Sequence, residues 1–347
     1  MRLRGPENIL ILKPGAIGDL LHLSPVVRAL RQKIADARIT LLVGDQASVD
    51  LYRHNPSVEE VLVYDKRGAH RSWRAFLELR RGLRRRRFDL VVNFQRSNPK
   101  AWLLATAAFP ARVLVYHKAR RRTVHVVENH LEAVAPLGID PMTADLRLEL
   151  FLGDEEERWA DALLAGERLV GRPLAALNPG ANHPVNRWPI GHFALLAERL
   201  HAELRCGVLL VGGPQDRELC DAVRAGSSAP LLDLAGRTTL LQLGAVLKRC
   251  AVAVSGDTGP MHLATAVGTR VTALFGAADP ARTGPVGTGH RVLRAPDVSC
   301  VPCRSRTCGH SRYLECMERI SVEEVFSAVA EIVGERDTGS GKALPRG

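Results

Sequence analysis

Short apolar runs alternate along the chain with longer stretches in which apolar residues recur at helical spacing. In the first half this pattern predicts strands at residues 9–12, 39–43, 58–63, 90–93 and 113–115. The stretches between them predict helices at residues 20–33, 73–86, 99–108 and 124–137. Unbroken apolar strands are typical of burial on both faces, so we expect a parallel sheet covered by helices on both sides.

A second series of the same kind follows an acidic helix predicted at residues 154–169. Its strands are expected at 174–177, 207–211, 231–233, 252–255, 271–275 and 291–294, and its helices at 190–204, 216–225, 240–249, 259–267 and 321–333. We therefore predict two Rossmann-like domains, 1–155 and 156–334, and a disordered polar tail, 335–347. Two doubly wound domains that face each other leave a central cleft, and ligands bind at the carboxyl ends of such strands.

Length and composition agree with two folded α/β domains. The chain has 347 residues, of which 46% are hydrophobic and 24% charged. The apolar run at residues 9–12 is too short for a signal peptide, and no run approaches the roughly 18 residues of a membrane span. We expect a cytoplasmic protein, or one that sits on a membrane surface without crossing it.

The net charge of +11 comes largely from arginine in the first half. Such a surface attracts the phosphates of nucleic acid, anionic lipid or a phosphorylated glycolipid, although a solvated helix face explains each cluster equally well. Aromatic residues make up only 5% of the chain and no recognition-helix motif is present, which argues against a nucleic-acid partner. The two clusters are Arg80, Arg81, Arg84, Arg85, Arg86 and Arg87, and Lys118, Arg120, Arg121 and Arg122.

The sequence Lys13-Pro-Gly-Ala-Ile-Gly-Asp19 follows the first strand and opens the first helix. Gly15 and Gly18 let the backbone approach a ligand closely, and N–H groups at a helix start favour an anion. The motif has neither the G-x-G-x-x-G spacing nor the Walker lysine. The alternative is that Asp19 is only the N-cap of the predicted helix 20–33.

Asn178-Pro-Gly-Ala181 and Asn186-Arg-Trp-Pro189 follow the first strand of the second half. Their amides and the Arg187 guanidinium suit a loop that donates hydrogen bonds to phosphate oxygens. An ordinary loop with Trp188 as a core anchor is the competing interpretation.

The most specific motif is Ser255-Gly-Asp-Thr-Gly-Pro-Met-His262, at another strand-to-helix corner. Backbone amides near Gly259 and the Thr258 hydroxyl suit a pyrophosphate, and Asp257 suits sugar hydroxyls or the orientation of Thr258 and His262. A helix cap made by Asp257 or Thr258 is the alternative. Gln215 and Asp216, after Gly212-Gly213-Pro214, suit a ribose or base as well as a plain turn.

These four segments, in this order, resemble the ADP-heptose:lipopolysaccharide heptosyltransferases of glycosyltransferase family 9. The resemblance runs from about residue 9 to 333 and implies the GT-B fold. The motifs that carry it are KPGAIGDLLH at 13–22, NPGA with RWP at 178–189, GGPxD at 212–216 and SGDTGPxHLA at 255–264.

The resemblance implies roles for these residues. Asp19 matches the catalytic base of an inverting transfer in which the diphosphate leaves as the acceptor hydroxyl attacks. Many members have lysine where this chain has Asn186, so phosphate neutralisation is expected to depend on Arg187, helped by Lys13. The implied donor site comprises Lys13, Gly15, Gly18, Asn178, Arg187, Gln215, Asp216, Asp257, Thr258, Gly259 and His262.

The implied partners are ADP-heptose and a phosphorylated lipid A–core glycolipid on the cytoplasmic face of the inner membrane, with no cofactor and no nucleic acid. The sequence has no D-x-D metal motif, and this mechanism requires no metal. Basic residues on loops of the first half are candidates for acceptor binding, namely Lys66, Arg67, Arg71, Arg96 and Lys100.

Two alternatives stay open beside this interpretation. A transferase or epimerase that uses another nucleotide-diphosphate sugar would share the scaffold. Separately, Cys300, Cys303, Cys308 and Cys316 form a C-x2-C-x4-C-x7-C cluster that suits zinc, reduced structural thiols or a local disulfide. The remaining cysteines, Cys206, Cys220 and Cys250, are expected to be buried small hydrophobes.

Overall fold

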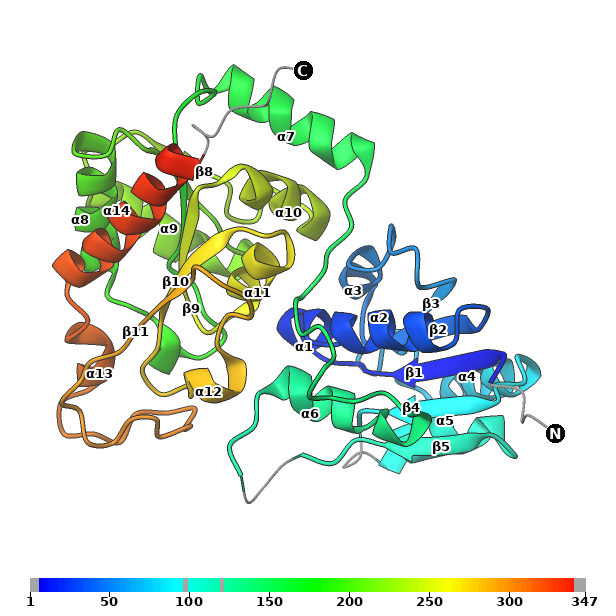
Figure 1. Cartoon of the computed structure of the whole chain (residues 1–347). Helices are drawn as coiled ribbons and strands as arrows, with labels where there is room; N and C mark the ends of the chain where they lie inside the picture. The colour runs from blue at the N-terminus through cyan, green and yellow to red at the C-terminus, as the bar shows by residue number, and fades with distance from the viewer. Residues whose placement is uncertain (1–5, 96–98, 119–121, 340–347) are drawn as a thin grey trace. The chain divides into compact units, whose positions relative to one another are not determined.

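The computed structural model describes residues 6–95, 99–118 and 122–339. The chain divides into two compact units, Met1–Phe151 and Leu152–Gly347, which we call unit 1 and unit 2. Each unit is a parallel sheet with helices on both faces (Figure 1). The sequence-based boundary was placed after residue 155.

In unit 1 the strands follow the order β3-β2-β1-β4-β5, and every pairing is parallel. The order reverses between β1 and β4, so the carboxyl ends of these two strands form the topological switch point of unit 1. The strands are β1 Asn8–Leu12, β2 Arg38–Val43, β3 Glu60–Val63, β4 Leu90–Asn93 and β5 Arg112–Val115. The helices are α1 Ile17–Leu21, α2 Ser24–Lys33, α3 Gln46–Asp50, α4 Trp73–Arg85, α5 Pro99–Ala105 and α6 Val126–Glu132, with 3-10 turns η1 Thr106–Ala108 and η2 Ala135–Leu137.

The predicted single helix at residues 20–33 is wrong, because the chain forms two helices, α1 and α2, there. Pro25 has no N–H for the Leu21 carbonyl and its ring crowds that oxygen, which favours a break at this point. The Ser24 hydroxyl donates to the Leu21 carbonyl instead, at 2.7 Å. Since α1 begins at Ile17, Asp19 is its third residue and not an N-cap.

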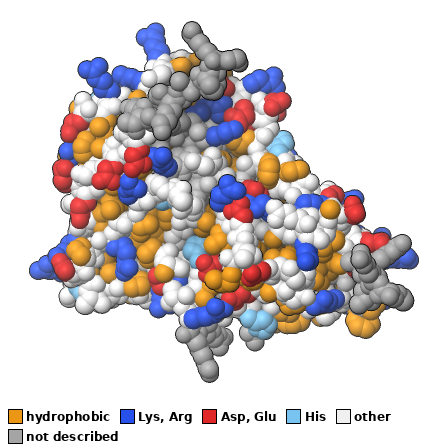
Figure 2. Space-filling view, viewed as in Figure 1, with side chains coloured by type: hydrophobic (Ala, Val, Ile, Leu, Met, Phe, Trp, Pro, Cys, Tyr) orange, Lys and Arg blue, Asp and Glu red, His pale blue; other side chains and the backbone are white. Residues whose placement is uncertain are grey.

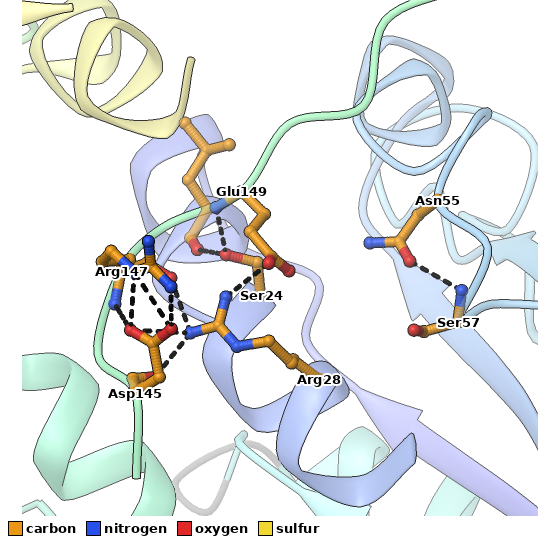
Figure 3. A network of polar contacts seen from close by, with 8 residues as sticks. Ser24, Arg28, Asn55, Ser57, Asp145, Arg147 and Glu149 are labelled. Carbon is orange, nitrogen blue, oxygen red and sulfur yellow. Dashed lines mark hydrogen bonds and ion pairs between the residues drawn. The ribbon is translucent and has the colours of Figure 1, made fainter. Parts of the chain in front are cut away.

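The segment that leads out of unit 1 is tied to α2 by a polar network (Figure 3). The Arg28 guanidinium donates to the carbonyls of Asp145 and Arg147 and pairs with the Glu149 carboxylate at 2.6 Å. The Glu149 N–H donates to Ser24 Oγ at 2.9 Å. Hydrogen bonds from Arg147, together with the charge of Arg28, lower the pKa of Asp145 to about 2. This network fixes the course of the chain along the α2 side of unit 1.

In unit 2 the strand order is β11-β10-β9-β6-β7-β8, again all parallel, and it reverses between β6 and β9. The strands are β6 Leu174–Asn178, β7 Gly207–Leu210, β8 Leu231–Asp233, β9 Val252–Gly256, β10 Arg270–Leu274 and β11 Arg291–Leu293. The helices are α7 Asp154–Gly166, α8 Ile190–Ala202, α9 Arg217–Ala225, α10 Leu240–Arg249, α11 Gly259–Ala266, α12 Pro280–Thr283, α13 Glu315–Glu318 and α14 Val322–Gly339, with 3-10 turns η3 Pro184–Asn186 and η4 Pro214–Asp216.

The core of unit 2 settles two expectations. Trp188 is 2% exposed and its indole N–H donates to the Ile320 carbonyl at 2.9 Å, so it is a core anchor. Cys206, Cys220 and Cys250 are buried, as expected. Burial raises the pKa of the Cys220 thiol to about 12, which keeps this thiol protonated and chemically inert.

The predicted disorder from residue 335 onward is wrong for the first part of that tail, because α14 continues to Gly339. Glu335 pairs with Arg270 at 2.8 Å and with Arg291 at 2.9 Å. These ion pairs tie the last turns of α14 to β10 and β11. Residues 340–347 lie outside the described part.

No helix among the described residues is long and apolar enough to span a membrane. On the face shown in Figure 2, Lys and Arg side chains alternate with Asp and Glu side chains. The excess of arginine therefore does not form a single basic patch on that face.

Candidate functional site

The switch point of unit 1 holds the first sequence motif. The Lys13 side chain is 8% exposed, and its Nζ lies 3.2 Å from Oδ1 of Asp19, whose side chain is 46% exposed. The other carboxylate oxygen accepts from the Ala16 N–H at 3.4 Å. A Cβ on Gly15 would lie 2.9 Å from the Cβ of Asp19, so glycine is required for the carboxylate to fold back over this turn. The result is a fixed, half-exposed carboxylate beside a buried ammonium.

Two buried polar residues complete this switch point, and neither was identified from the sequence. Asn93 ends β4 fully buried; its Oδ1 accepts from the Gln95 N–H at 2.8 Å, and its Nδ2 has no partner within the described chain. His130 is 1% exposed and packs edge-on against Phe94 and Tyr116. Asn93 is a polar residue at the end of an apolar strand, and this position could have identified it as a candidate site residue. Nothing in the sequence around His130 indicates that it belongs to the site.

The imidazole of His130 is neutral. Its Nδ1 lies 3.2 Å from the His22 carbonyl, which requires a proton on Nδ1 for a hydrogen bond. Burial first, and then the positive charge of Lys13, lowers the pKa of His130 to about 3. A buried, neutral ring therefore lies within electrostatic reach of the Lys13 ammonium.

The described candidate acceptor residues lie on the loop after β3 and at the start of α5. Lys66, Arg67 and Arg71 are exposed on the loop after β3. This loop is shaped by Asp65, whose carboxylate accepts three backbone N–H groups, and these bonds lower the pKa of Asp65. Lys100, at the start of α5, lies with its Nζ 5.9 Å from the centre of the Trp73 ring. Arg96 lies outside the described residues.

The switch point of unit 2 joins the ends of β6 and β9. The Asn178 Nδ2 donates to Ser255 Oγ at 2.9 Å and to the Gly180 carbonyl at 3.1 Å, and Thr258 Oγ1 lies 3.4 Å away. The Oδ1 of Asn178 is buried and has no partner among the described residues. The second and third sequence motifs are thus brought together, as the parallel strand order requires.

The helix that starts at this corner is not capped by a side chain. Thr258 occupies the N-cap of α11 without a capping hydrogen bond, so the capping alternative for Thr258 is wrong. The Asp257 carboxylate instead accepts from the Thr283 hydroxyl at 2.9 Å and lies 3.5 Å from Nε2 of His262. Because no described side chain caps α11, its first backbone N–H groups stay available to an anion, as binding at a helix start requires.

Arg187 is held by its own loop, because Nε and Nη2 both donate to the Ala181 carbonyl, at 3.2 and 2.9 Å. That loop packs tightly on β9: a Cβ on Gly256 would lie 2.3 Å from the Asn186 carbonyl oxygen. The motif at 186–189 and the end of β9 are therefore locked together through backbone contact.

The Asp216 carboxylate points towards the loops at residues 178–181 and 212–215. Its Oδ2 accepts from the Gly213 N–H at 2.9 Å and from Gln215 Nε2 at 3.2 Å. A Cβ on Gly180 would lie 2.2 Å from Asp216 Oδ1, so this carboxylate fills the space beside the Asn178 loop. The segment at 212–216 therefore belongs to the same corner as Asn178.

The cysteine cluster lines a separate cavity of 290 Å³ in unit 2. All four thiols are free, and among the described residues no three His, Cys, Asp or Glu side chains are placed to hold a metal ion. Burial, followed by the neighbouring thiols, raises the pKa of Cys316 to about 11. No disulfide joins these four thiols in this structure, and the choice between zinc and reduced structural thiols stays a prediction. The four residues are Cys300, Cys303, Cys308 and Cys316.

The sequence resemblance is supported by comparison with known proteins. A family model for glycosyltransferase family 9 (heptosyltransferase) matches residues 76–314, which is more than half of the chain. The chain belongs to glycosyltransferase family 9. It is therefore a glycosyltransferase, and its two parallel α/β units are the two domains of the GT-B fold.

Family 9 relatives match this chain over nearly its whole length. Lipopolysaccharide heptosyltransferase 3 of Escherichia coli is 26% identical, over 93% of this chain and 98% of that protein. A family 9 structure from Veillonella parvula is 24% identical with a TM-score of 0.83, covering 95% of this chain and 98% of its own. The E. coli ADP-heptose lps heptosyltransferase II structure is 22% identical with a TM-score of 0.77, covering 95% and 99%.

Proposed function

We propose that this family 9 member is an inverting heptosyltransferase that transfers a heptose from ADP-heptose to the inner core of lipopolysaccharide. Its relatives bear the names of lipopolysaccharide heptosyltransferases, which supports the donor and the acceptor class. The observation that carries the proposal is the half-exposed carboxylate of Asp19, fixed at a switch point beside the buried ammonium of Lys13.

We assign donor binding chiefly to unit 2. The uncapped start of α11 favours a pyrophosphate, and the buried Asn178 Oδ1 can accept from a ligand hydroxyl. Arg187 adds positive charge near this corner, and Gln215 and Asp216 suit the ribose. The full proposed donor set is Lys13, Gly15, Gly18, Asn178, Arg187, Gln215, Asp216, Asp257, Thr258, Gly259 and His262.

We assign the acceptor to unit 1, where the exposed Lys66, Arg67 and Arg71 and the nearby Lys100 offer cations to its phosphates. In the transfer, Asp19 accepts the proton of the acceptor hydroxyl. The hydroxyl oxygen then bonds to the anomeric carbon while the bond from that carbon to the diphosphate breaks, and the electron pair leaves on ADP. One displacement from the face opposite the leaving group inverts the anomeric centre.

Charge that develops on the leaving ADP would be stabilised by fixed donors, since preorganised N–H groups need no rearrangement during the reaction. The N–H groups at the start of α11 and the Arg187 guanidinium have this role in our proposal. The chemistry calls for no cofactor. Because the acceptor is membrane-borne, we further propose that the enzyme works at the cytoplasmic face of the inner membrane, in peripheral contact with it.

A donor screen tests this proposal. Purified protein would be offered ADP-heptose, a UDP-hexose or a GDP-hexose, with heptose-free lipopolysaccharide as acceptor, and followed by thermal shift and by mass spectrometry of the product. We expect only ADP-heptose to raise the melting temperature at low concentration and to give a product one heptose heavier. Preference for a different donor would refute the heptose assignment and leave family membership intact.

A further inference from the structure

One side of unit 1 exposes large apolar side chains to solvent. Trp73 is 55% exposed, Trp102 and Leu103 are each 40% exposed, and Phe109 is 81% exposed. They come from three elements, α4, α5 and the end of η1, which pack against one another. We call the surface formed by these four residues the α4–α5 surface.

Contacts between α4 and α5 hold this surface together. The Arg80 Nε donates to the Leu103 carbonyl at 3.1 Å, and Lys100 lies over the Trp73 ring. The Trp73 ring in turn stacks on the buried Phe76 ring, with centroids 5.2 Å apart. The Trp73 ring is therefore held in place from both sides of the contact between α4 and α5.

The spacing along α4 places aromatic and basic side chains on one flank. Trp73, Arg80 and Arg84 are separated by seven and four residues, so they lie in one stripe along the helix. Because Arg80 bonds α5, this stripe is the flank that borders α5. The helix has 13 residues and is about 20 Å long, so the stripe extends from the carboxyl edge of the sheet towards its amino edge.

The charged side chains of α4 are almost all positive. From Trp73 to Arg87 the only acidic residue is Glu78, which pairs with Arg74, and Arg86 is engaged by Glu60. Arg81, Arg84 and Arg85 are exposed along α4, and Arg87 is exposed just after it. Tryptophan beside arginine is the pairing typical of the membrane–water boundary, where the rings enter the headgroup layer and the cations meet lipid phosphates.

We propose that the α4–α5 surface docks on an anionic lipid bilayer. The inference deepens the membrane contact proposed above and rests on that proposal, because it assigns the contact to specific residues. Anionic phosphates complement the exposed arginines, and the three aromatic rings supply apolar area that phosphates alone would not require. The surface begins at Trp73 and Lys100, next to the loops proposed for the acceptor, so docking would bring those loops close to a lipid-borne substrate.

The experiment measures sedimentation of the full chain with sucrose-loaded vesicles, in the absence of any nucleotide sugar or acceptor. Wild type is expected to bind vesicles that contain phosphatidylglycerol and not vesicles of phosphatidylcholine alone. Arg81→Glu with Arg84→Glu should weaken binding at least tenfold, because it replaces two cations that attract an anionic surface by two anions that it repels. Trp102→Gln with Phe109→Gln should weaken it by a similar factor, through lost apolar burial.

Matched variants distinguish docking from general effects. Met142→Gln with Val170→Gln removes exposed apolar side chains elsewhere, and Arg168→Glu with Arg205→Glu makes the same change in net charge on unit 2. Both controls should bind vesicles as wild type does, and all variants should keep the wild-type circular dichroism spectrum. Equal losses in controls and test variants, or no binding by wild type, would overturn the proposal.

Tighter binding of a single-stranded oligonucleotide, lost in the same test variants, would also overturn it in favour of a nucleic-acid surface. Because no sugar donor or acceptor is present, a negative vesicle result leaves the proposed transfer reaction untouched. Conversely, a failed donor screen would leave the vesicle result standing.

Discussion

Lys13 and Asp19 form an ion pair whose two members differ sharply in exposure, since the lysine side chain is 8% exposed and the aspartate side chain 46%. Burying an ammonium is costly unless a charge partner stays close. Here the partner is a carboxylate that the Ala16 N–H also holds from the first turn of α1. The pair therefore presents a carboxylate with a fixed orientation to solvent, which is the property required of a base that must meet an incoming hydroxyl.

Replacing Asp19 by asparagine tests this role directly. Asp19→Asn keeps the shape and removes the proton acceptor, so we expect kcat to fall by at least about a hundredfold. Donor affinity, measured by calorimetry, should change little. Asp36→Asn, at an exposed aspartate of the same unit, is the matched control and should leave kcat unchanged. Full activity in Asp19→Asn would show that another group takes the proton.

Lys13 is expected to act on catalysis by holding the carboxylate in place. Lys13→Met keeps the length of the side chain and removes the ammonium, so the Asp19 carboxylate loses its fixed partner and kcat should fall about tenfold or more. Stability should be maintained, since replacing a buried charge by an apolar group of similar volume is often neutral or favourable. Steady-state kinetics and urea unfolding measure the two effects. A higher donor KM with unchanged kcat would instead indicate that Lys13 only binds phosphate.

Hydrophobic patterning located the strands of both sheets and the loops that carry the chemistry. A buried parallel strand requires an apolar run, and Leu90–Asn93 and Leu231–Asp233 were predicted to the residue. The break between α1 and α2 was missed because it depends on Pro25 and on a hydrogen bond from Ser24 that replaces a backbone bond. The spacing of apolar residues carries no information about a side-chain hydrogen bond that takes the place of a backbone one.

Two further features that the sequence did not predict depend on contacts between residues distant in sequence. His130 reaches the first switch point from α6, more than a hundred residues after His22, whose carbonyl it contacts. The ion pairs of Glu335 with Arg270 and Arg291 extend α14 into a segment whose composition favours disorder. Neither contact has a local sequence signal, because each depends on how the sheet order brings separate segments together.

Gly256 tests whether the loop of Arg187 must pack directly on β9. In Gly256→Ala the new Cβ would lie 2.3 Å from the Asn186 carbonyl oxygen, which is backbone and cannot rotate away. We expect the loop to shift, with donor affinity at least about tenfold weaker by calorimetry. The matched control is Gly191→Ala in α8, where a Cβ meets nothing within 4 Å and alanine should stabilise the helix slightly. Unchanged donor affinity in Gly256→Ala would mean that this loop does not bind the donor.

The buried imidazole of His130 should make unit 1 sensitive to mild acid. Its pKa is about 3 in the folded state and about 6.5 when unfolded, so between these values the unfolded chain binds a proton that the folded chain does not. Stability contributed by the neutral ring is therefore complete above pH 6.5 and is lost as the pH falls. By linkage this one group costs about 3 kcal/mol of unfolding free energy between pH 6.5 and pH 4.

His130→Asn isolates that contribution, because asparagine keeps a donor for the His22 carbonyl and has no titrating ring. The variant should be less stable than wild type at pH 7, where packing against Phe94 and Tyr116 is lost. Its urea midpoint should then fall less steeply towards pH 4, so the two stability curves converge. His117→Asn, at an exposed histidine, should follow the wild-type curve. Parallel curves for wild type and His130→Asn would show that the ring takes up its proton without unfolding the site.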